Sequence, residues 1–503
     1  MGKGYSPRIA ANPYIVGSFA CIGGGLFGLD ISSMSGFCPT PAISAFSTTP
    51  TVMLRVQWSL ACQQVCSSQP TSYPGTDRPP GSLFGALTVS WLADKIGRKR
   101  VIQISGLVWV VGSILQCAAV NRGMLVVGRI ISGFAIGLAS STVPLYQSEI
   151  TPPAIRGRMV SLQQWAITWG ILIQYFIQFG CSYIDGVASF RIPWGLQLIP
   201  GLILSIGMTW FPESPRWLMD HDRYDEALEV LSDVHGHGDP NAELVQLEYN
   251  EIREAVEFER KEGAKKWSDL LRPGVFRRVV LGTSLQMWSQ LTGMNVMMYY
   301  VVYVFEGAVR PERGCTIPAI IFIDKWGRRP MLLIGLAFMS FWLFLVGGLQ
   351  GGYGNWGTST TGDRVWVIEG HDSVTKGIIV CSDLPVRVRA KGQSLSTATN
   401  WIFNFALAWA VPPGFATISY KTYFIFATFN AAAFIHVLFM YPETKGRTLE
   451  EIEEIFAQGH TFAAWKIKND VGHRTLAQVK GATQHEQSSD EKIAHVHDEK
   501  AHV

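Results

Sequence analysis

Long apolar runs without a charged residue recur along this chain, separated by short charged segments. Six of them are Val101–Val120, Met159–Tyr183, Ile192–Trp210, Val279–Tyr303, Met331–Tyr353 and Thr422–Tyr441. A helix needs about 20 predominantly apolar residues to cross the hydrocarbon core of a bilayer. Six such runs do not fit into one soluble core, so the pattern predicts an all-α protein that crosses a membrane many times.

Other spans are less regular but follow the same pattern. They are Tyr14–Leu29, Gly123–Leu145, Ser394–Pro412 and the short Pro80–Ala93. Only 16% of the 503 residues are charged, well below the roughly 25% that is usual for soluble domains. The net charge of +3 is too small to suggest a nucleic-acid partner. No cleavable signal peptide precedes the first span.

Two charged motifs each occur twice at an offset of 230 residues (94 to 324 and 212 to 442). Asp94–Arg100 is echoed by Asp324–Pro330, and Phe211–Arg216 is echoed by Tyr441–Arg447. Each basic cluster adjoins a long apolar run. Two parallel halves with basic loop motifs are typical of membrane transporters.

The distribution of charge orients the chain and divides it. Basic residues gather on the cytosolic side of membrane proteins, which places Lys95–Arg100, the long polar loop and both termini in the cytosol. Helical periodicity within that loop covers Tyr224–Val234 and Ala242–Glu262. The predicted domains are an N-terminal membrane half (1–211), a cytosolic helical linker (212–278), a C-terminal membrane half (279–441) and a cytosolic tail (442–503) that is disordered after about residue 462.

Short motifs follow one another in a fixed order. They are Gly97–Lys99, Gly128–Arg129, Pro144–Glu149, Arg156–Arg158, Pro212–Arg216, Gln290–Asn295 and Pro442–Gly446. Together they resemble the sugar-porter branch of the major facilitator superfamily, most closely its fungal hexose transporters. The resemblance implies a twelve-helix fold, built as two six-helix halves in parallel repeat. It also implies hexose transport by alternating access, by a monomer in the plasma membrane, and no enzymatic activity.

No cofactor or metal site is predicted. The eight cysteines are scattered along the chain. Cys62 and Cys66 lie in the first outer loop, where they could pair, but they supply too few ligands for a zinc site.

Amide side chains inside the apolar runs are the predicted sugar ligands. A buried donor or acceptor left unpaired costs about 1–3 kcal/mol, so a site for the hydroxyls of a hexose needs matching polar groups. Asn and Gln offer donors and acceptors without the desolvation cost of a charge. The candidates are Gln164, Gln286, Gln290 and Asn295, to which the resemblance adds Asn400 and Trp401. The alternative role of these amides is hydrogen bonding between helices.

Ser289 precedes Gln290 where the family often has two adjacent glutamines. A shorter hydroxyl at this position changes the contact to the sugar. The identity of the hexose is therefore left open.

One carboxylate and one guanidinium are candidates for proton coupling. Asp30 closes the first predicted span, and Arg129 lies within the fourth. A nearby guanidinium favours the ionised form of a carboxyl group that burial would otherwise keep protonated. A pair that separates and rejoins would link protonation to conformation. Proton symport and facilitated diffusion both fit this pattern.

The basic motifs also suggest gates. The resemblance implies a cytosolic salt-bridge network in each half of the molecule. Its members are Asp94, Arg98, Glu149, Arg156, Arg158, Glu213 and Arg216 in the first half, and Asp324, Arg328, Arg389, Glu443 and Arg447 in the second. The alternative is that these charges only set the topology.

Three stretches depart from the family pattern. Residues 37–79 replace the usual outer loop and the start of helix two, which leaves helix two short. Only Thr316–Ile323 is apolar between residues 303 and 324, and no span fits between 376 and 387. Helices eight and ten are therefore predicted to be truncated or missing. Losing both would invert helix nine and move Asp324–Arg329 to the outside.

A chain without these helices is expected to transport poorly. The leading interpretation is a hexose transporter whose sequence is incomplete because of a misannotated gene model. The alternatives are a transporter-like glucose sensor and a non-functional remnant. Sensors of this kind carry a long cytosolic tail, and the 62 residues of 442–503 are few for that role.

Overall fold

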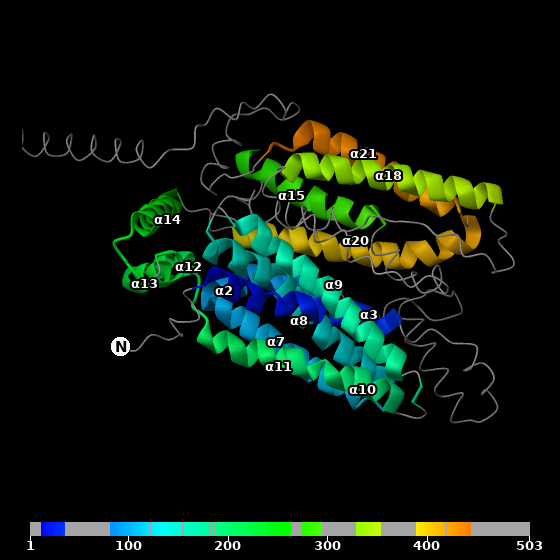
Figure 1. The fold of residues 1–503 in the computed structure, drawn as a ribbon, viewed down its shortest axis with the longest axis horizontal. Coiled ribbons are helices and arrows are strands. Elements are labelled where there is room, and N and C mark those ends of the chain that lie inside the picture. The colour runs from blue at the N-terminus through cyan, green and yellow to red at the C-terminus, as the bar shows by residue number, and fades with distance from the viewer. Residues whose placement is uncertain are drawn as a thin grey trace, which may run out of the picture.

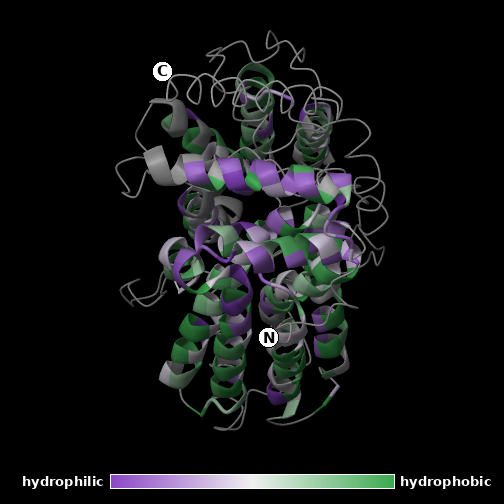
Figure 2. Cartoon of the chain, turned by 90° about the vertical axis from the view of Figure 1, so that its left-hand side faces the viewer, coloured by the Kyte–Doolittle hydropathy of each residue, from purple (hydrophilic) through white to green (hydrophobic). Residues whose placement is uncertain are grey.

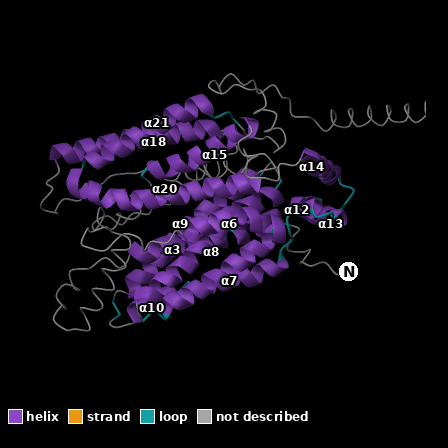
Figure 3. Cartoon of the chain, turned by 180° about the vertical axis from the view of Figure 1, so that it is seen from behind, coloured by secondary structure: helices purple, strands orange, loops and turns teal. Residues whose placement is uncertain are grey.

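The computed structural model describes eleven segments of the chain. They are residues 12–35, 81–120, 122–152, 155–181, 183–184, 188–236, 238–262, 273–293, 328–353, 389–418 and 420–443. All the secondary structure in these segments is helical (Figure 3). Helices two, eight and ten were predicted to be short or missing in the stretches 37–79, 303–324 and 376–387. All three stretches lie outside the described segments. The tail after residue 443 also lies outside them.

The N-terminal half is a bundle of long helices. They are α2 (Pro13–Ala20), α3 (Ile22–Ser35), α6 (Gly81–Ile96), α7 (Arg98–Cys117), α8 (Arg122–Ile150), α9 (Arg156–Cys181), α10 (Ala188–Leu196) and α11 (Leu198–Gly207), followed by the 3₁₀ turn η1 (Met208–Trp210). Helix α3 packs on α9, while α6 and α7 pack on α8. Ile102, Trp109, Tyr146 and Leu204 form part of the buried core.

The first span differs from the sequence prediction. Backbone hydrogen bonds continue through Cys21, which joins α2 to α3. Helix α3 then runs on to Ser35, so Asp30 lies inside the first span and not at its end. The polar residues after Asp30 concealed this continuation, because hydropathy follows side chains and the helical hydrogen bonds are made by the backbone.

The C-terminal half forms a second layer beside the first (Figure 1). Its described helices are α15 (Pro273–Leu291), α18 (Arg328–Tyr353), α20 (Arg389–Ile418) and α21 (Lys421–Met440). Helix α20 packs on α15 within its own half, and on α6 and α8 of the other half. It is therefore the main described contact between the two halves.

The inversion predicted for helix nine is wrong in this structure. Arg329, at the start of α18, donates from Nη2 to the carbonyl oxygen of Leu438 (2.7 Å), near the C-terminal end of α21. The start of α15 lies at the same end, where the Tyr441 hydroxyl donates to the carbonyl oxygen of Leu281 (2.6 Å). The second basic motif therefore begins α18 at the same end as these groups, the end that the charge rule assigns to the cytosol.

The linker forms a small helical unit at one end of the bundle. It comprises α12 (Pro215–Asp220), α13 (Tyr224–His235) and α14 (Glu243–Glu262), which confirms the two helices predicted there. Figures 1 and 2 show the unit at the ends of the long helices, with the hydrophilic α14 lying across them. Trp217, Leu231, Val245 and Ile252 form part of its own core.

Five described helical segments are long and apolar enough to cross a membrane. They are Arg98–Cys117, Gly123–Ile150, Arg191–Trp210, Arg329–Gly348 and Lys421–Met440. None of them contains a predicted sugar-binding amide. Gln164, Gln286, Gln290 and Asn400 lie on α9, α15 and α20, whose hydropathy their polar side chains lower.

Small residues let the helices of the N-terminal half approach closely. A Cβ atom on Gly137 of α8 would lie 2.2 Å from the carbonyl oxygen of Ser82 and 3.0 Å from the Cα atom of Gly85, both on α6. Gly28 of α3 and Gly170 of α9 meet the facing backbone in the same way. Close packing of this kind is a principal source of attraction between helices in lipid.

We predict that Gly137→Ala destabilises the protein, by about 1–3 kcal/mol, because the new methyl group meets backbone that cannot move aside. Gly180→Ala is the matched control, because its Cβ atom would meet nothing within 4 Å and alanine favours the helix. Thermal unfolding in detergent measures both variants. Equal unfolding temperatures would show that the α6–α8 contact tolerates the added group.

Candidate functional site

Two predicted sugar ligands meet at the contact between α15 and α20. Gln290 of α15 is 5% exposed and donates from Nε2 to the Oδ1 oxygen of Asn400 (2.5 Å). Asn404 donates from Nδ2 to the Oε1 oxygen of Gln290 (3.3 Å). The sequence analysis missed Asn404, although it lies one turn beyond Asn400 on the same helix.

Trp401 lies at the boundary between the two halves. Its ring meets Phe27 of α3 edge to face, with centroids 5.2 Å apart, and packs against the core of the N-terminal half. Its indole nitrogen Nε1 is buried and has no hydrogen-bond partner among the described residues. A buried, unpaired donor of this kind is suited to a hydroxyl group of a ligand.

The other predicted sugar ligands are less closely gathered. Gln164 on α9 and Gln286 on α15 are both half-buried. Asn295 lies outside the described residues. The structure therefore brings together Gln290 and Asn400 and adds Asn404. Gln286 lies one turn before Gln290 on α15, and Gln164 lies on α9 of the other half.

Asp30 and Arg129 form an ion pair between α3 and α8. Both side chains are mostly buried, with 20% of Asp30 and 15% of Arg129 exposed. Behind Arg129, its carbonyl oxygen accepts a hydrogen bond from Ser132, whose hydroxyl in turn accepts from Gln116 of α7 (2.9 Å). The predicted proximity of the two charges is confirmed.

A charged cluster closes the end of the N-terminal half that the charge rule assigns to the cytosol. We call Asp94, Arg98, Glu149, Glu213 and Ser214 the cytosolic cluster. Arg98 Nε lies 3.1 Å from the Glu149 carboxylate, and its guanidinium lies 3.6 Å from Asp94. Ser214 donates its hydroxyl to Glu149 (2.6 Å). The Arg98 and Glu149 side chains are only 12% and 3% exposed. The cluster thus joins α6, α7, α8 and the start of the linker.

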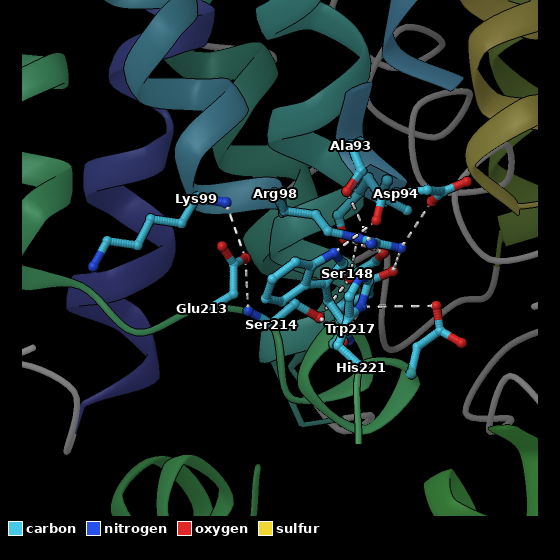
Figure 4. A network of polar contacts seen from close by, with 12 residues as sticks. Ala93, Asp94, Arg98, Lys99, Ser148, Glu213, Ser214, Trp217 and His221 are labelled. Atoms are coloured by element: carbon cyan, nitrogen blue, oxygen red, sulfur yellow. Dashed lines mark hydrogen bonds and ion pairs between the residues drawn. The ribbon is translucent and has the colours of Figure 1, made fainter. Parts of the chain in front are cut away.

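Glu213 binds backbone groups at the beginning of α7. Its Oε1 oxygen accepts from the N–H groups of Lys99 and Ser214, each at 3.0 Å (Figure 4). The first N–H groups of a helix lack partners within the helix and favour a negative charge. Burial raises the pKa of Glu213, while these hydrogen bonds and the nearby Arg98 act in the opposite direction.

Gly97 explains how this contact forms. Its φ of +97° turns the chain just before α7. A Cβ atom at this position would lie 2.3 Å from the Glu213 carboxylate. Glycine at position 97 therefore leaves room for the Glu213 carboxylate, which any larger side chain at that position would displace.

The same contact recurs in the second half. Arg329 donates its backbone N–H to the Glu443 carboxylate (3.1 Å). Arg329 and Glu443 each lie 230 residues after Lys99 and Glu213. The repeat read from the sequence is therefore a repeat of geometry, in which a carboxylate holds the first turn of a membrane helix.

Several predicted members of the gates are not placed. Asp324 and Arg447 lie outside the described residues, as do the side chains of Arg156, Arg328 and Arg389. Arg158 is exposed on α9, and Arg216 is buried in α12.

Lys391 is a residue that the sequence analysis missed. It lies near the start of α20, in the opposite half from Asp94, yet its positive charge acts on the Asp94 carboxylate. Its position in the basic segment Arg387–Lys391 was the available signal. No group of three potential metal ligands occurs among the described residues.

Known proteins resemble this chain along most of its length. It is 48% identical to the glucose transporter mfs1 of Aspergillus flavus, an alignment that covers 90% of this chain and 91% of that relative. It is 40% identical to a high-affinity glucose transporter of Kluyveromyces lactis, over 91% of this chain and 87% of the relative. It is 31% identical to the high glucose sensor RGT2 of Saccharomyces cerevisiae, but spans only 63% of that protein.

Solved structures share the fold. The proton:xylose symporter XylE bound to 6-bromo-6-deoxy-D-glucose superposes with a TM-score of 0.73 at 22% identity, over 90% of this chain and 100% of that chain. The inward-open conformation of XylE from E. coli gives a TM-score of 0.59 at 22% identity, over 88% of this chain and 99% of that chain. Both are proteins of the major facilitator superfamily, which confirms the predicted fold class.

The chain also matches the profile of a protein family, and this match covers both halves and the linker between them. The profile of the family described as "Sugar (and other) transporter" matches residues 16–456. This chain belongs to the Sugar (and other) transporter family and is a multi-pass membrane protein.

Proposed function

We propose that this protein carries hexoses such as glucose across the plasma membrane as a monomer, by alternating access. The observation that carries the proposal is the amide cluster of Gln290, Asn400 and Asn404 on facing helices, with the unpaired Trp401 indole on the same helix as the two asparagines. The relatives named as glucose transporters of Aspergillus flavus and Kluyveromyces lactis are 48% and 40% identical to this chain, whereas the glucose sensor is 31% identical. This difference favours transport over sensing.

The chemistry of the cluster suits a neutral sugar. Each amide offers both donors and acceptors, as a hydroxyl group does. Without sugar, Gln290 and the two asparagines satisfy one another and avoid buried unpaired groups. A hexose would replace some of these bonds with its own hydroxyls, while the Trp401 indole would donate to another. Gln164 and Gln286, which are half-buried on α9 and α15, would complete the ring of contacts.

The cytosolic cluster would act as the inner gate. Arg98, Glu149 and Ser214 tie α7, α8 and the linker together. Lys391, near the start of α20 in the other half, would add a positive charge beside Asp94. The fold superposes better on the sugar-analogue-bound form of XylE than on its inward-open form. This supports a state that is closed toward the cytosol.

Asp30 and Arg129 would couple protons to this cycle. Protonation of Asp30 removes one charge of the pair and leaves Arg129 without its counterion, which favours a different arrangement of α3 and α8. Proton symport then follows if separation of the pair accompanies sugar entry. Facilitated diffusion follows if the pair stays intact throughout, in which case Asp30 and Arg129 only hold α3 against α8.

We predict that Gln290→Ala weakens glucose binding by about 1–3 kcal/mol, because Asn400 and Asn404 then lose a buried partner. Concentration-dependent uptake in a host without hexose carriers gives the KM, which should rise at least about fivefold. Gln246→Ala, a change at a half-buried glutamine of α14 in the linker, is the control and should leave the KM unaltered. An unchanged KM for Gln290→Ala would remove this residue from the sugar site. Uptake of amino acids but not of hexoses would refute the proposed function.

We predict that Asp30→Asn abolishes uphill accumulation and leaves exchange of sugar down its gradient partly intact, because asparagine resembles the protonated acid. Steady-state accumulation of a non-metabolised hexose, at acidic and neutral external pH and with or without a protonophore, tests this. Accumulation driven by pH that survives in the variant would rule out Asp30 as the coupling group. A parent protein that never exceeds equilibrium would be a facilitator.

We predict that Glu149→Ala loosens the cytosolic end, at a cost of about 3 kcal/mol to the closed arrangement, because it removes the nearer of the two carboxylates that pair with the buried Arg98. Hydrogen exchange of peptides covering residues 208–220 should become faster. Glu257→Ala is the control: its ion pair with Arg253 is exposed, so solvent screens the interaction. Exchange at the same rate in both variants would show that Glu149 does not hold the gate.

A further inference from the structure

Helix α15 is held from two opposite sides. Gly282, Gln286 and Gln290 recur every fourth residue and share one face. On this face Ser396 of α20 donates to the carbonyl oxygen of Gly282 (2.8 Å), and Asn400 accepts from Gln290. This is the face that carries the proposed sugar ligands.

The opposite face of α15 contacts α21 through Ser284, Trp288 and Thr292, which also recur every fourth residue. The Ser284 hydroxyl lies 2.9 Å from that of Tyr441. Trp288 and Thr292 meet two polar side chains of α21, namely His436 and Asn430. Helix α21 contributes none of the proposed sugar ligands, so its own polar residues need another explanation.

Asn430 caps the end of α15 inside the membrane. The last regular residue of α15 is Leu291, and Gly293 follows with a φ of +88°. The carbonyl groups of a final helical turn lack partners within the helix, and lipid supplies none. Asn430, which is fully buried, donates from Nδ2 to the carbonyl oxygen of Thr292 (3.2 Å) and to that of Phe426 in its own helix (2.9 Å).

His436 fixes the ring that precedes the sugar ligand. Trp288 donates from Nε1 to Nδ1 of His436 (3.0 Å). The imidazole is therefore an acceptor at Nδ1 and carries its hydrogen at Nε2. Tyr441 packs edge to face on the other side of the imidazole, with centroids 5.5 Å apart. Trp288 and Gln290 lie two residues apart on the same helix. A contact that holds the Trp288 ring in place therefore also limits the rotation of α15 about its axis, and with it the direction of the Gln290 side chain.

We propose that Asn430 and His436 are positioning residues for sugar recognition: they hold α15 at the height and rotation that present Gln290 to Asn400, Asn404 and a bound hexose. A helix turns by about 100° per residue, so a small rotation of α15 would carry the Gln290 amide away from its partners on α20. The two contacts lie six residues apart on α21 and therefore set both the height and the rotation. This inference rests on the proposed sugar site at Gln290.

The test measures glucose uptake by the full-length chain in a host without hexose carriers, with the KM and the Vmax per molecule at the surface. Asn430→Leu and His436→Leu each remove one hydrogen bond to α15. Each should raise the KM about tenfold, the effect of about 1.4 kcal/mol, with Vmax within about twofold. His436→Asn should restore most of the affinity, because its Oδ1 oxygen can accept from Trp288 in place of Nδ1.

Trp288→Phe is a milder variant, which keeps an aromatic ring and removes only the N–H donor. It should raise the KM by about the amount expected for His436→Leu. It therefore still tests the proposal if the leucine variants fail to reach the membrane. Thr428→Val is the matched control on α21, because among the described residues the Thr428 hydroxyl bonds to the carbonyl oxygen of Phe424 in its own helix and to no other helix. The control should leave the KM unchanged.

Two results separate this inference from the proposed function. If Gln290→Ala raises the KM while Trp288→Phe and His436→Leu leave it unchanged, the sugar site stands and the positioning role is refuted. The same conclusion follows if the variants lower only the amount and thermal stability of the protein. If Gln290→Ala itself leaves the KM unchanged, the proposed sugar site fails first.

Discussion

The interior of a bilayer offers no hydrogen-bond partners, and this constraint shapes every part of the molecule. Backbone groups satisfy one another within helices, and the helices approach through glycines such as Gly85 and Gly137. Where a helix ends inside the membrane, another helix must supply the missing donor. Asn430 does so for α15, which ends beside the amides proposed to bind sugar.

The same constraint explains where the charges lie. Arg98 and Glu149 are nearly buried and pair with each other at the cytosolic end, because a buried charge without a partner is far more costly than a paired one. Deeper in the bundle, Arg129 is paired with Asp30. Such a pair is stable as long as it is intact, and protonation or motion of one member shifts the balance. That property suits a protein whose two halves must change their relative position.

The two halves also share a device at the start of a membrane helix. Glu213 accepts the backbone N–H of Lys99, and Glu443 accepts that of Arg329, at positions that the 230-residue repeat equates. A carboxylate at a helix N-terminus is favoured by the unpaired N–H groups and by the helix dipole. The charge rule that places these motifs in the cytosol and the local hydrogen bonds therefore act together.

The sequence by itself determined the helical type of the main spans, the two linker helices, the internal repeat and the set of amides available for sugar binding, because hydropathy, charge and helical period are local properties of the chain. Only the tertiary structure decided which of those groups meet. Gln290 pairs with Asn400 and Asn404, which are more than a hundred residues away; Glu213 binds backbone N–H groups; Asp30 lies inside a span; and α18 begins at the cytosolic end. The physical reason is that such contacts depend on the depth and rotation of whole helices, which packing between distant segments sets and no local pattern encodes.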